Sequence, residues 1–149
     1  MKRNCREDSK ITVKKQLSLA LYGATSRLIR QHRPFLEPLG ITYPQFLVMM
    51  TLYETSPRTV GDIGQTLGMD NGTLTPLLKR LVKAGFVTRE RDPADERRVL
   101  IDLTGAGKAI RTELKAVTGK VETACRLSEQ ELKELRDTLD GLGLPPNKQ

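Results

Sequence analysis

The sequence of 149 residues contains no tryptophan, two cysteines and one histidine, and aromatic residues make up 4% of it. Few aromatic side chains argue against a single-strand nucleic-acid binder, which stacks bases on such platforms. A lone histidine without a cluster of acidic or thiol side chains does not predict a metal site, and we expect no cofactor. Cys5 and Cys125 lie far apart. They predict free thiols in a reducing cytoplasm rather than a disulfide framework.

Long apolar runs and enzyme motifs are also missing. No run of about 18 apolar residues is present, so we expect no transmembrane helix. Met1–Ser9 is polar, so we expect no secretory signal. No glycine-rich phosphate loop occurs, and Ser18 has no histidine and aspartate partners in a recognisable motif. These absences favour a cytoplasmic protein that is neither an enzyme nor membrane-bound.

Basic residues outnumber acidic ones by 25 to 18, which gives a net charge of +7. The surplus is uneven: residues 1–15 carry six basic and two acidic side chains, and residues 71–91 carry five and one. Residues 104–149 are nearly balanced, with eight and seven. A localised surplus indicates an anionic partner, either nucleic acid or an acidic membrane surface.

We expect one domain at 13–149 behind a basic flexible tail at 1–12. Apolar residues recur every three or four positions over 13–28, as on one face of a long first helix. Pro34 and Pro38 are expected to end this helix. Its basic residues gather toward one end, over a stripe suited to a core, which disfavours a role at a membrane surface.

The middle of the chain predicts a helix-turn-helix. After a second helix, Thr59 is placed to cap a short third helix and Asp70 a fourth. About three residues separate these two helices, which is the helix-turn-helix spacing. Pro76 falls inside the fourth helix, where it removes a backbone donor. A helix beginning at Thr75 would avoid this conflict but would be short, so we keep the longer one.

The apolar period changes from helical to alternating after Gly85. Residues 86–91 and 99–103 predict two strands, joined by a charged turn at 92–98. A hairpin directly after a helix-turn-helix is a wing. The fold class we expect is therefore mainly α with a small β wing, a winged helix-turn-helix at 43–103.

Two more helices complete the six that we expect. Thr104 is placed to cap a fifth helix that runs to about Cys125, and Ser128 and Glu131 form a capping box for a sixth. Leucines of the sixth helix recur with a 3-4-3 spacing. This stripe predicts packing, either within one chain or across a dimer.

Three segments carry a resemblance when taken together: Tyr43–Phe46, Asp70–Leu81 and, in the predicted wing, Asp92–Val99 followed by Leu103-Thr104. They resemble the MarR family of transcriptional regulators, and most closely its organic-hydroperoxide-sensing branch. The resemblance covers about residues 14–140. It implies a regulator, usually a repressor, that releases DNA when a small molecule binds it or an oxidant modifies it.

The resemblance also implies a homodimer in which the helices at 13–38 and 104–143 interlock. Each protomer would then offer one recognition helix and one wing to a palindromic duplex. Such a dimer spaces its two reading heads about 34–36 Å apart, one turn of DNA, or a multiple of it.

The predicted recognition helix begins with small polar residues. Asn71, Thr73 and Thr75 lie where side chains meet base edges in the major groove. Lys79, one turn further on, and Arg89, on the first wing strand, suit phosphates, which fix register without reading sequence.

The wing supplies three further candidates. The family's wing-tip Asp and Arg match Asp95 and Arg97 here. A cation on a narrow hairpin can enter the minor groove, where negative potential is concentrated. Asp95 is suited to orient Arg97 through a charge-assisted hydrogen bond. Arg98 is another candidate, and the alternative for all three is an ordinary solvated turn.

The expected trigger departs from the hydroperoxide-sensing branch. That branch carries a Gln-Leu-Cys segment, and here the same register holds Gln16-Leu17-Ser18. A serine hydroxyl cannot replace the thiolate that peroxide attacks. Whether this serine is native or an engineered replacement for cysteine is open at this point.

Other pocket positions are retained. Tyr22 lies one helical turn after Ser18, Tyr43 matches a pocket tyrosine, and His32 takes the place of a further one. These four residues predict an effector pocket for a small, partly apolar molecule, although His32 is also explained as a polar residue near a helix end. Cys125 is a possible redox residue or an inert thiol.

A winged-helix module that binds proteins instead of DNA is the alternative function. DNA binding should weaken steeply with added salt, and Arg97→Ala should weaken it. An interaction module should show neither effect.

Overall fold

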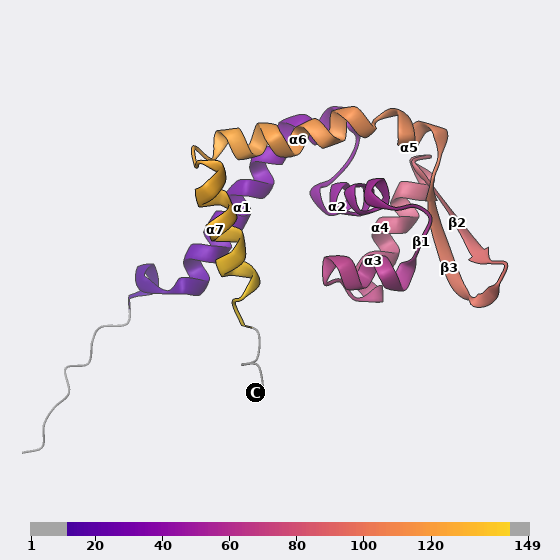
Figure 1. Cartoon of the computed structure of the whole chain (residues 1–149), viewed down its shortest axis with the longest axis horizontal. Coiled ribbons are helices and arrows are strands. Elements are labelled where there is room, and N and C mark those ends of the chain that lie inside the picture. Colours follow the sequence, from indigo (N-terminus) through magenta and orange to yellow (C-terminus); the bar gives the residue numbers. More distant parts are fainter. Residues whose placement is uncertain (1–11, 144–149) are drawn as a thin grey trace, which may run out of the picture.

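The computed structural model describes residues 12–143, which form helices and one small antiparallel sheet. Figure 1 shows an arch with two ends, which we call the arm and the head. The arm consists of α1 (Leu17–Leu36), α6 (Arg111–Ala124) and α7 (Glu129–Asp140). The head consists of α2 (Tyr43–Glu54), β1 (Arg58–Thr59), α3 (Val60–Leu67), α4 (Asn71–Lys83), β2 (Val87–Asp92), β3 (Asp95–Leu103) and α5 (Gly105–Ala109). Short 3-10 helices at Val13–Lys15 and Glu37–Leu39 flank α1.

The predicted fold class, mainly α with a small β wing, is confirmed. Within 12–143 the chain forms seven α-helices instead of the expected six. None of these helices is long and apolar enough to span a membrane. The predicted tail at 1–12, with Cys5, lies outside the described residues except for Thr12.

Pro34 lies inside α1, so the prediction that it ends the helix is wrong. A proline inside a helix removes its own backbone donor and crowds the carbonyl four residues earlier, but here the helix continues for two more residues. The Glu37 N–H still donates to the Arg33 carbonyl, and a 3-10 turn extends the chain to Gly40. Gly40 adopts a φ of 66°, which favours glycine, and the direction changes there.

The core lies in the head and continues under α6. Two predicted helix caps are present. Thr59 Oγ1 accepts the Asp62 N–H at 3.1 Å at the start of α3, and Asp70 caps α4. The buried side chains come from α1, α2, α3, α4, the sheet and α6, and the largest of them are Leu36, Met49, Leu52, Ile63, Leu74, Leu78, Leu81, Ile101 and Leu114.

The wing differs from prediction in two ways. The turn is only Pro93-Ala94, because Asp92 pairs with Asp95 after a register shift at Arg91. The predicted turn at 92–98 is therefore wrong at Asp92, which lies on β2, and beyond residue 94, so Arg97 and Arg98 lie on β3. The two-residue strand β1, which pairs with β3, was also not predicted.

The predicted fifth helix is broken at Ile110, where φ and ψ are −90° and 5°. Before the break, α5 is held against the sheet, because the Thr104 N–H donates to the Phe86 carbonyl at 3.1 Å. At Gly107 a Cβ would lie 2.1 Å from that same carbonyl oxygen, so only glycine fits. After the break, α6 packs against α1 instead.

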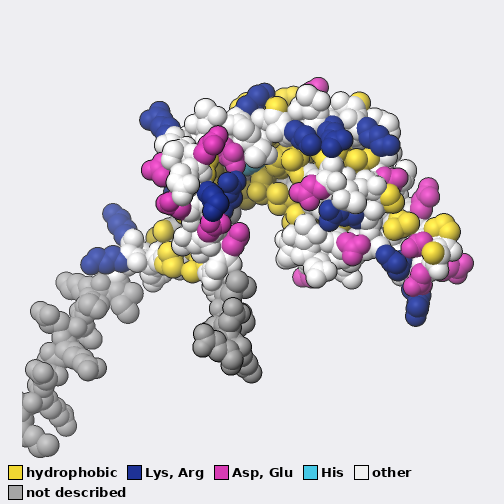
Figure 2. Space-filling view, in the orientation of Figure 1, with side chains coloured by type: hydrophobic (Ala, Val, Ile, Leu, Met, Phe, Trp, Pro, Cys, Tyr) yellow, Lys and Arg dark blue, Asp and Glu magenta, His cyan; other side chains and the backbone are white. Residues whose placement is uncertain are grey.

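Two apolar stripes of the arm stay uncovered within one chain. Leu17 on α1 is 62% exposed, and the α7 leucines Leu135 and Leu139 are exposed as well. Figure 2 shows hydrophobic side chains gathered in the concavity between arm and head and along the lower arm. The leucine stripe of α7 therefore does not pack within the protomer.

Candidate nucleic-acid interface

Helix α4 presents its first turn to solvent. Asp70 Oδ1 accepts the Thr73 backbone N–H at 2.7 Å. This bond, with a further one from the Thr73 hydroxyl, holds the pKa of Asp70 below its usual value. Gly68 ends α3 with a φ of 63°, and Gly64 has no room for a side chain, since a Cβ would meet the Met69 carbonyl oxygen at 2.8 Å. The tight turn fixes α4 against α3.

The polar candidates of α4 lie away from its leucine face. Asn71, Thr73 and Lys79 are exposed and Thr75 is half-buried, whereas the leucines of the helix are buried. Pro76 is accommodated inside the helix. The arrangement leaves one polar edge of α4 free to meet a duplex.

The predicted hydrogen bond between Asp95 and Arg97 is present. The backbone N–H and Nε of Arg97 both donate to Asp95 Oδ1 at 3.1 Å, and Nη2 approaches Oδ2 at 3.4 Å. The Arg97 side chain, the main cause, holds the pKa of Asp95 below its usual value. The Arg97 side chain is still 92% exposed. It is therefore oriented without being buried.

The other wing cations have different surroundings. Arg98 Nε lies 3.8 Å from Asp92 Oδ2, so this charge is partly balanced. Arg89 is exposed on β2 opposite Ile101. Helix α4 contacts β2, and Figure 2 shows basic side chains among acidic ones at the free end of the wing. The recognition helix and the wing thus form one continuous part of the head.

The structure separates the four predicted pocket residues into two pairs. Ser18 and Tyr22 lie exposed at the start of α1. His32 lies 14 positions beyond Ser18, roughly 21 Å along the helix at 1.5 Å per residue. There its ring meets Tyr43 with centroids 4.7 Å apart, and its Nδ1 donates to the Leu28 carbonyl at 2.7 Å. One chain alone does not bring the four together.

A cavity of about 500 Å³ lies between the second half of α1 and the segment that enters α2. Of the four predicted residues only Tyr43 lines it, and burial raises the pKa of this phenol. Arg30 and Arg33 contribute charge to its wall, and the apolar part includes Ile29 and Ile41.

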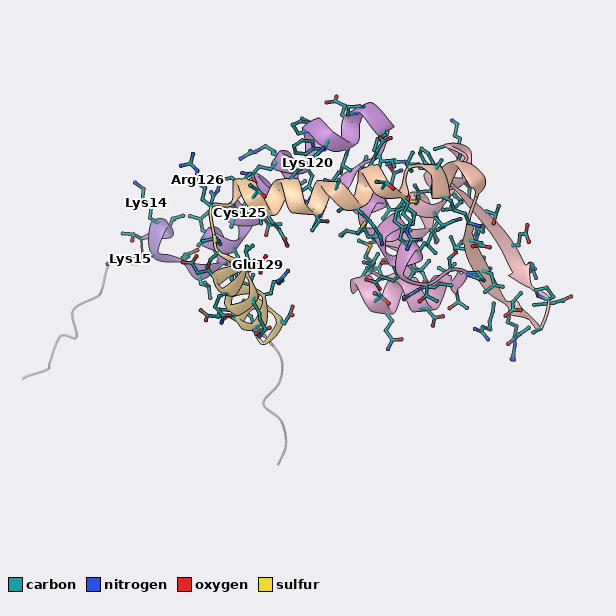
Figure 3. All side chains as sticks on the ribbon, turned by 45° about the horizontal axis from the view of Figure 1, so that its top comes forward. Lys14, Lys15, Lys120, Cys125, Arg126 and Glu129 are labelled. Atoms are coloured by element: carbon teal, nitrogen blue, oxygen red, sulfur yellow. The ribbon has the colours of Figure 1, made fainter. Side chains whose placement is uncertain are left out.

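Cys125 lies in the arm, far from the wing. Figure 3 shows it at the end of α6, next to Arg126 and before α7 begins at Glu129. Its thiol is half-buried and donates to the Val121 carbonyl at 3.3 Å. Among residues 12–143 no three His, Cys, Asp or Glu side chains are placed to hold a metal.

Sequence reasoning overlooked the residues that join arm to head: Tyr53, Gly107 and Arg111. The Tyr53 hydroxyl donates to the Gly107 carbonyl, and Arg111 donates to the Tyr53 carbonyl. A tyrosine near the end of a buried helix is explained by packing alone, so the sequence contains no distinct signal for it.

A helix-turn-helix with an exposed polar second helix, followed by a two-stranded wing that carries an oriented arginine, defines a winged helix-turn-helix protein. By sequence as well as fold, the chain belongs to the MarR family: the family model matches residues 41–99. The chain is 39% identical over 124 residues to the organic hydroperoxide resistance transcriptional regulator of Bacillus subtilis, covering 83% of this chain and 84% of that one. It is also 39% identical over 128 residues to the regulator MgrA of Staphylococcus aureus, with coverage of 85% and 87%.

Solved structures agree with this assignment. Reduced AbfR bound to DNA, a protein of Staphylococcus epidermidis, matches with a TM-score of 0.70 and 35% identity over 85% of this chain and 91% of that one. A mutant of MarR from E. coli, complexed with operator DNA, matches with a TM-score of 0.77 and 30% identity over 87% and 94%. The relatives are transcriptional regulators, so the assignment is to regulators and not to enzymes.

Proposed function

We infer that the protein is a transcriptional regulator that binds duplex DNA as a homodimer, with residues 43–103 as the reading unit. The observation that carries this inference is the pairing of Arg97 with Asp95 on an exposed wing, in the same head as the exposed polar edge of α4. DNA-bound relatives support DNA, and not another protein, as the partner. Action on DNA and the free thiol of Cys125 also support a cytoplasmic location.

In this proposal Asn71, Thr73 and Thr75 read base edges in the major groove and Lys79 and Arg89 contact phosphates. Arg97 enters the minor groove, oriented by Asp95. Arg98 takes a secondary role at the backbone, because Asp92 already balances part of its charge.

Selection from a library of duplexes with a randomised core tests the proposal. The parent protein should enrich a palindrome and bind it with an affinity that falls steeply with salt. Arg97→Ala should weaken binding, whereas Lys115→Ala, which removes one exposed positive charge from α6, should change it little. Equal loss in both variants would mean that net charge, and not the wing, holds the duplex.

We also propose that the protein represses transcription and releases DNA in response to an effector. The hydroperoxide-resistance relative supports an oxidant, but Ser18 removes the thiol that such a response needs in the first helix. The cavity beside Tyr43 supports a small, partly apolar molecule instead. Ser18 and Tyr22 join this pocket only if a second protomer supplies them, since they lie far from His32 on the same helix.

Fluorescence anisotropy of the selected duplex separates the two triggers. A small ligand should release DNA from the parent and from Cys125→Ser alike. Release by organic hydroperoxide that is lost in Cys125→Ser would instead identify Cys125 as the sensor and overturn the pocket.

A further inference from the structure

The chain passes between arm and head at two places, residues 37–42 between α1 and α2 and the break at Ile110 between α5 and α6, which we call the joint. On the head side, α5 is held on the sheet by the close approach of Gly107 to the Phe86 carbonyl. On the other side, α6 packs along α1 in the arm and also contacts α2 in the head. Figure 1 shows α6 crossing from the arm to α5 at the head. The angle at Ile110 is therefore one determinant of how the head is oriented on the arm, beside the α1–α2 connection.

Tyr53, at the end of α2, contacts both sides of this break. Its hydroxyl donates to the Gly107 carbonyl in α5 at 2.7 Å. Its own carbonyl accepts a bond from Nη2 of Arg111, the first residue of α6, at 3.1 Å, and the Arg111 guanidinium lies 5.8 Å from the centre of the Tyr53 ring. One residue thus bonds to the last turn before the break and to the first residue after it.

The Tyr53 side chain is suited to a fixed role. It is 5% exposed, so its ring position is set by the core. Burial raises the pKa of the phenol to about 12, against an opposing effect of the Arg111 charge, so the hydroxyl keeps the proton that it donates at neutral pH. A buried hydroxyl with a good acceptor is costly to displace.

A small change of angle at this joint would be amplified. Helix α6 has 14 residues, so at 1.5 Å per residue a rotation of about 10° at one end displaces the other by roughly 4 Å. This displacement is on the order of the ~3.4 Å rise of one base pair along a strand. In a symmetric dimer the change occurs twice.

We propose that Tyr53 is a positioning residue that fixes the α5–α6 angle, and with it the half-site separation that the dimer accepts. The inference rests on the proposed function, since it requires a dimer that reads two half-sites. Tyr53 contacts no DNA in this account. It acts through the joint, together with Arg111.

The test uses the palindrome selected by the parent protein, with one base pair inserted or deleted between its half-sites. The parent's affinity for the duplex should fall by about tenfold or more after either change, because the geometry of the dimer sets the half-site spacing. Tyr53→Phe keeps the ring and removes the hydroxyl, and Arg111→Met keeps the stem and removes the guanidinium. Both variants should still recognise the same half-site sequence as the parent. When the spacing is altered, their affinity for the duplex should fall by no more than about threefold.

Thr51→Val is the matched control. Thr51 is a buried residue of the same helix whose hydroxyl donates to the Leu47 carbonyl, within α2 and away from the joint. This variant should keep the parent's spacing preference even if its unfolding temperature falls. Tyr53→Phe or Arg111→Met with the parent's spacing preference would overturn the inference and leave the proposed function intact. A parent that enriches no duplex would overturn the proposed function itself.

Discussion

Gly107 leaves less room for a Cβ than any other glycine of the chain. A Cβ there would lie 2.1 Å from the Phe86 carbonyl oxygen and 3.1 Å from the carbonyl carbon. Because both atoms belong to the backbone, the sheet would have to move. We expect Gly107→Ala to lower the free energy of unfolding by about 1–3 kcal/mol, as overpacking does.

Urea unfolding at fixed protein concentration measures this loss. Gly105→Ala is the control, since a Cβ at Gly105, in the same short helix, meets nothing within 4 Å. Gly105→Ala should leave stability unchanged or slightly raised, because alanine favours helix. Equal stability of the two variants would contradict the close approach of Gly107 to the Phe86 carbonyl.

The Asp95 carboxyl should titrate below the usual aspartate range. Arg97 lowers its pKa, so the pair is fully formed above the ordinary aspartate pKa and is lost only as pH falls through the depressed value. Arg97→Gln should raise the midpoint toward normal. NMR titration of the Asp95 carboxyl measures the midpoint in the parent and in the variant. A parent midpoint at or above the ordinary aspartate value would mean that the pair does not form in solution.

Two substitutions in helix α4 should weaken DNA binding in two different ways. Thr73→Ala should relax preference at one or two base pairs and cost about 1–3 kcal/mol, since it removes a base-edge contact. Its backbone N–H still caps the helix through Asp70. Lys79→Ala should weaken all sequences similarly and reduce the salt slope by about one unit.

Binding isotherms over several salt concentrations, on the selected duplex and on single-base variants, distinguish the two effects. Each variant serves as the other's control. If both bind like the parent, α4 is not the recognition helix.

Capping chemistry made the starts of α3, α4 and α7 predictable. Thr59 and Asp70 accept the backbone N–H groups that the pattern assigns to them, and Ser128 forms its box with Glu131. These signals are local, so a sequence contains them. The recognition helix was found in this way, and the hairpin was found from the change to an alternating apolar period.

The missed elements depend on contacts between distant residues. The helix that breaks at Ile110 begins with α5, which is held by the close approach of Gly107 to Phe86 from the other end of the hairpin. Strand β1 has two residues, too few for an alternating pattern, and exists because Arg58 and Thr59 pair with β3. Neither of these two contacts leaves a signal in the local sequence.

At the scale of the molecule, the candidate site was only partly predictable. Asp95 and Arg97 were placed together because they are close in sequence. The four pocket residues were taken from the family resemblance, although Ser18 and His32 lie 14 positions apart on one helix and so cannot meet within a single chain. A complete pocket around all four residues requires a second copy of the chain.

The uncovered leucine stripe of α7 should pack across the dimer. Leu139 is 41% exposed in the protomer. A buried leucine contributes about 1.5–3 kcal/mol and a symmetric interface contains it twice, so Leu139→Lys should raise the dimer dissociation constant by about 100-fold or more. Thr138→Lys adds the same charge to the neighbouring exposed position and should leave the dimer intact. Sedimentation equilibrium measures both constants, and equal values would exclude this stripe from the interface.

The central claim is that two copies of the head, held by their arms, meet one duplex together. Sedimentation velocity of the parent protein mixed with its selected palindromic duplex at low ionic strength tests it most directly. We predict a single complex of two chains per duplex, which dissociates as salt is raised. A monomer that stays monomeric with DNA, or a dimer that leaves the duplex free, would contradict the account.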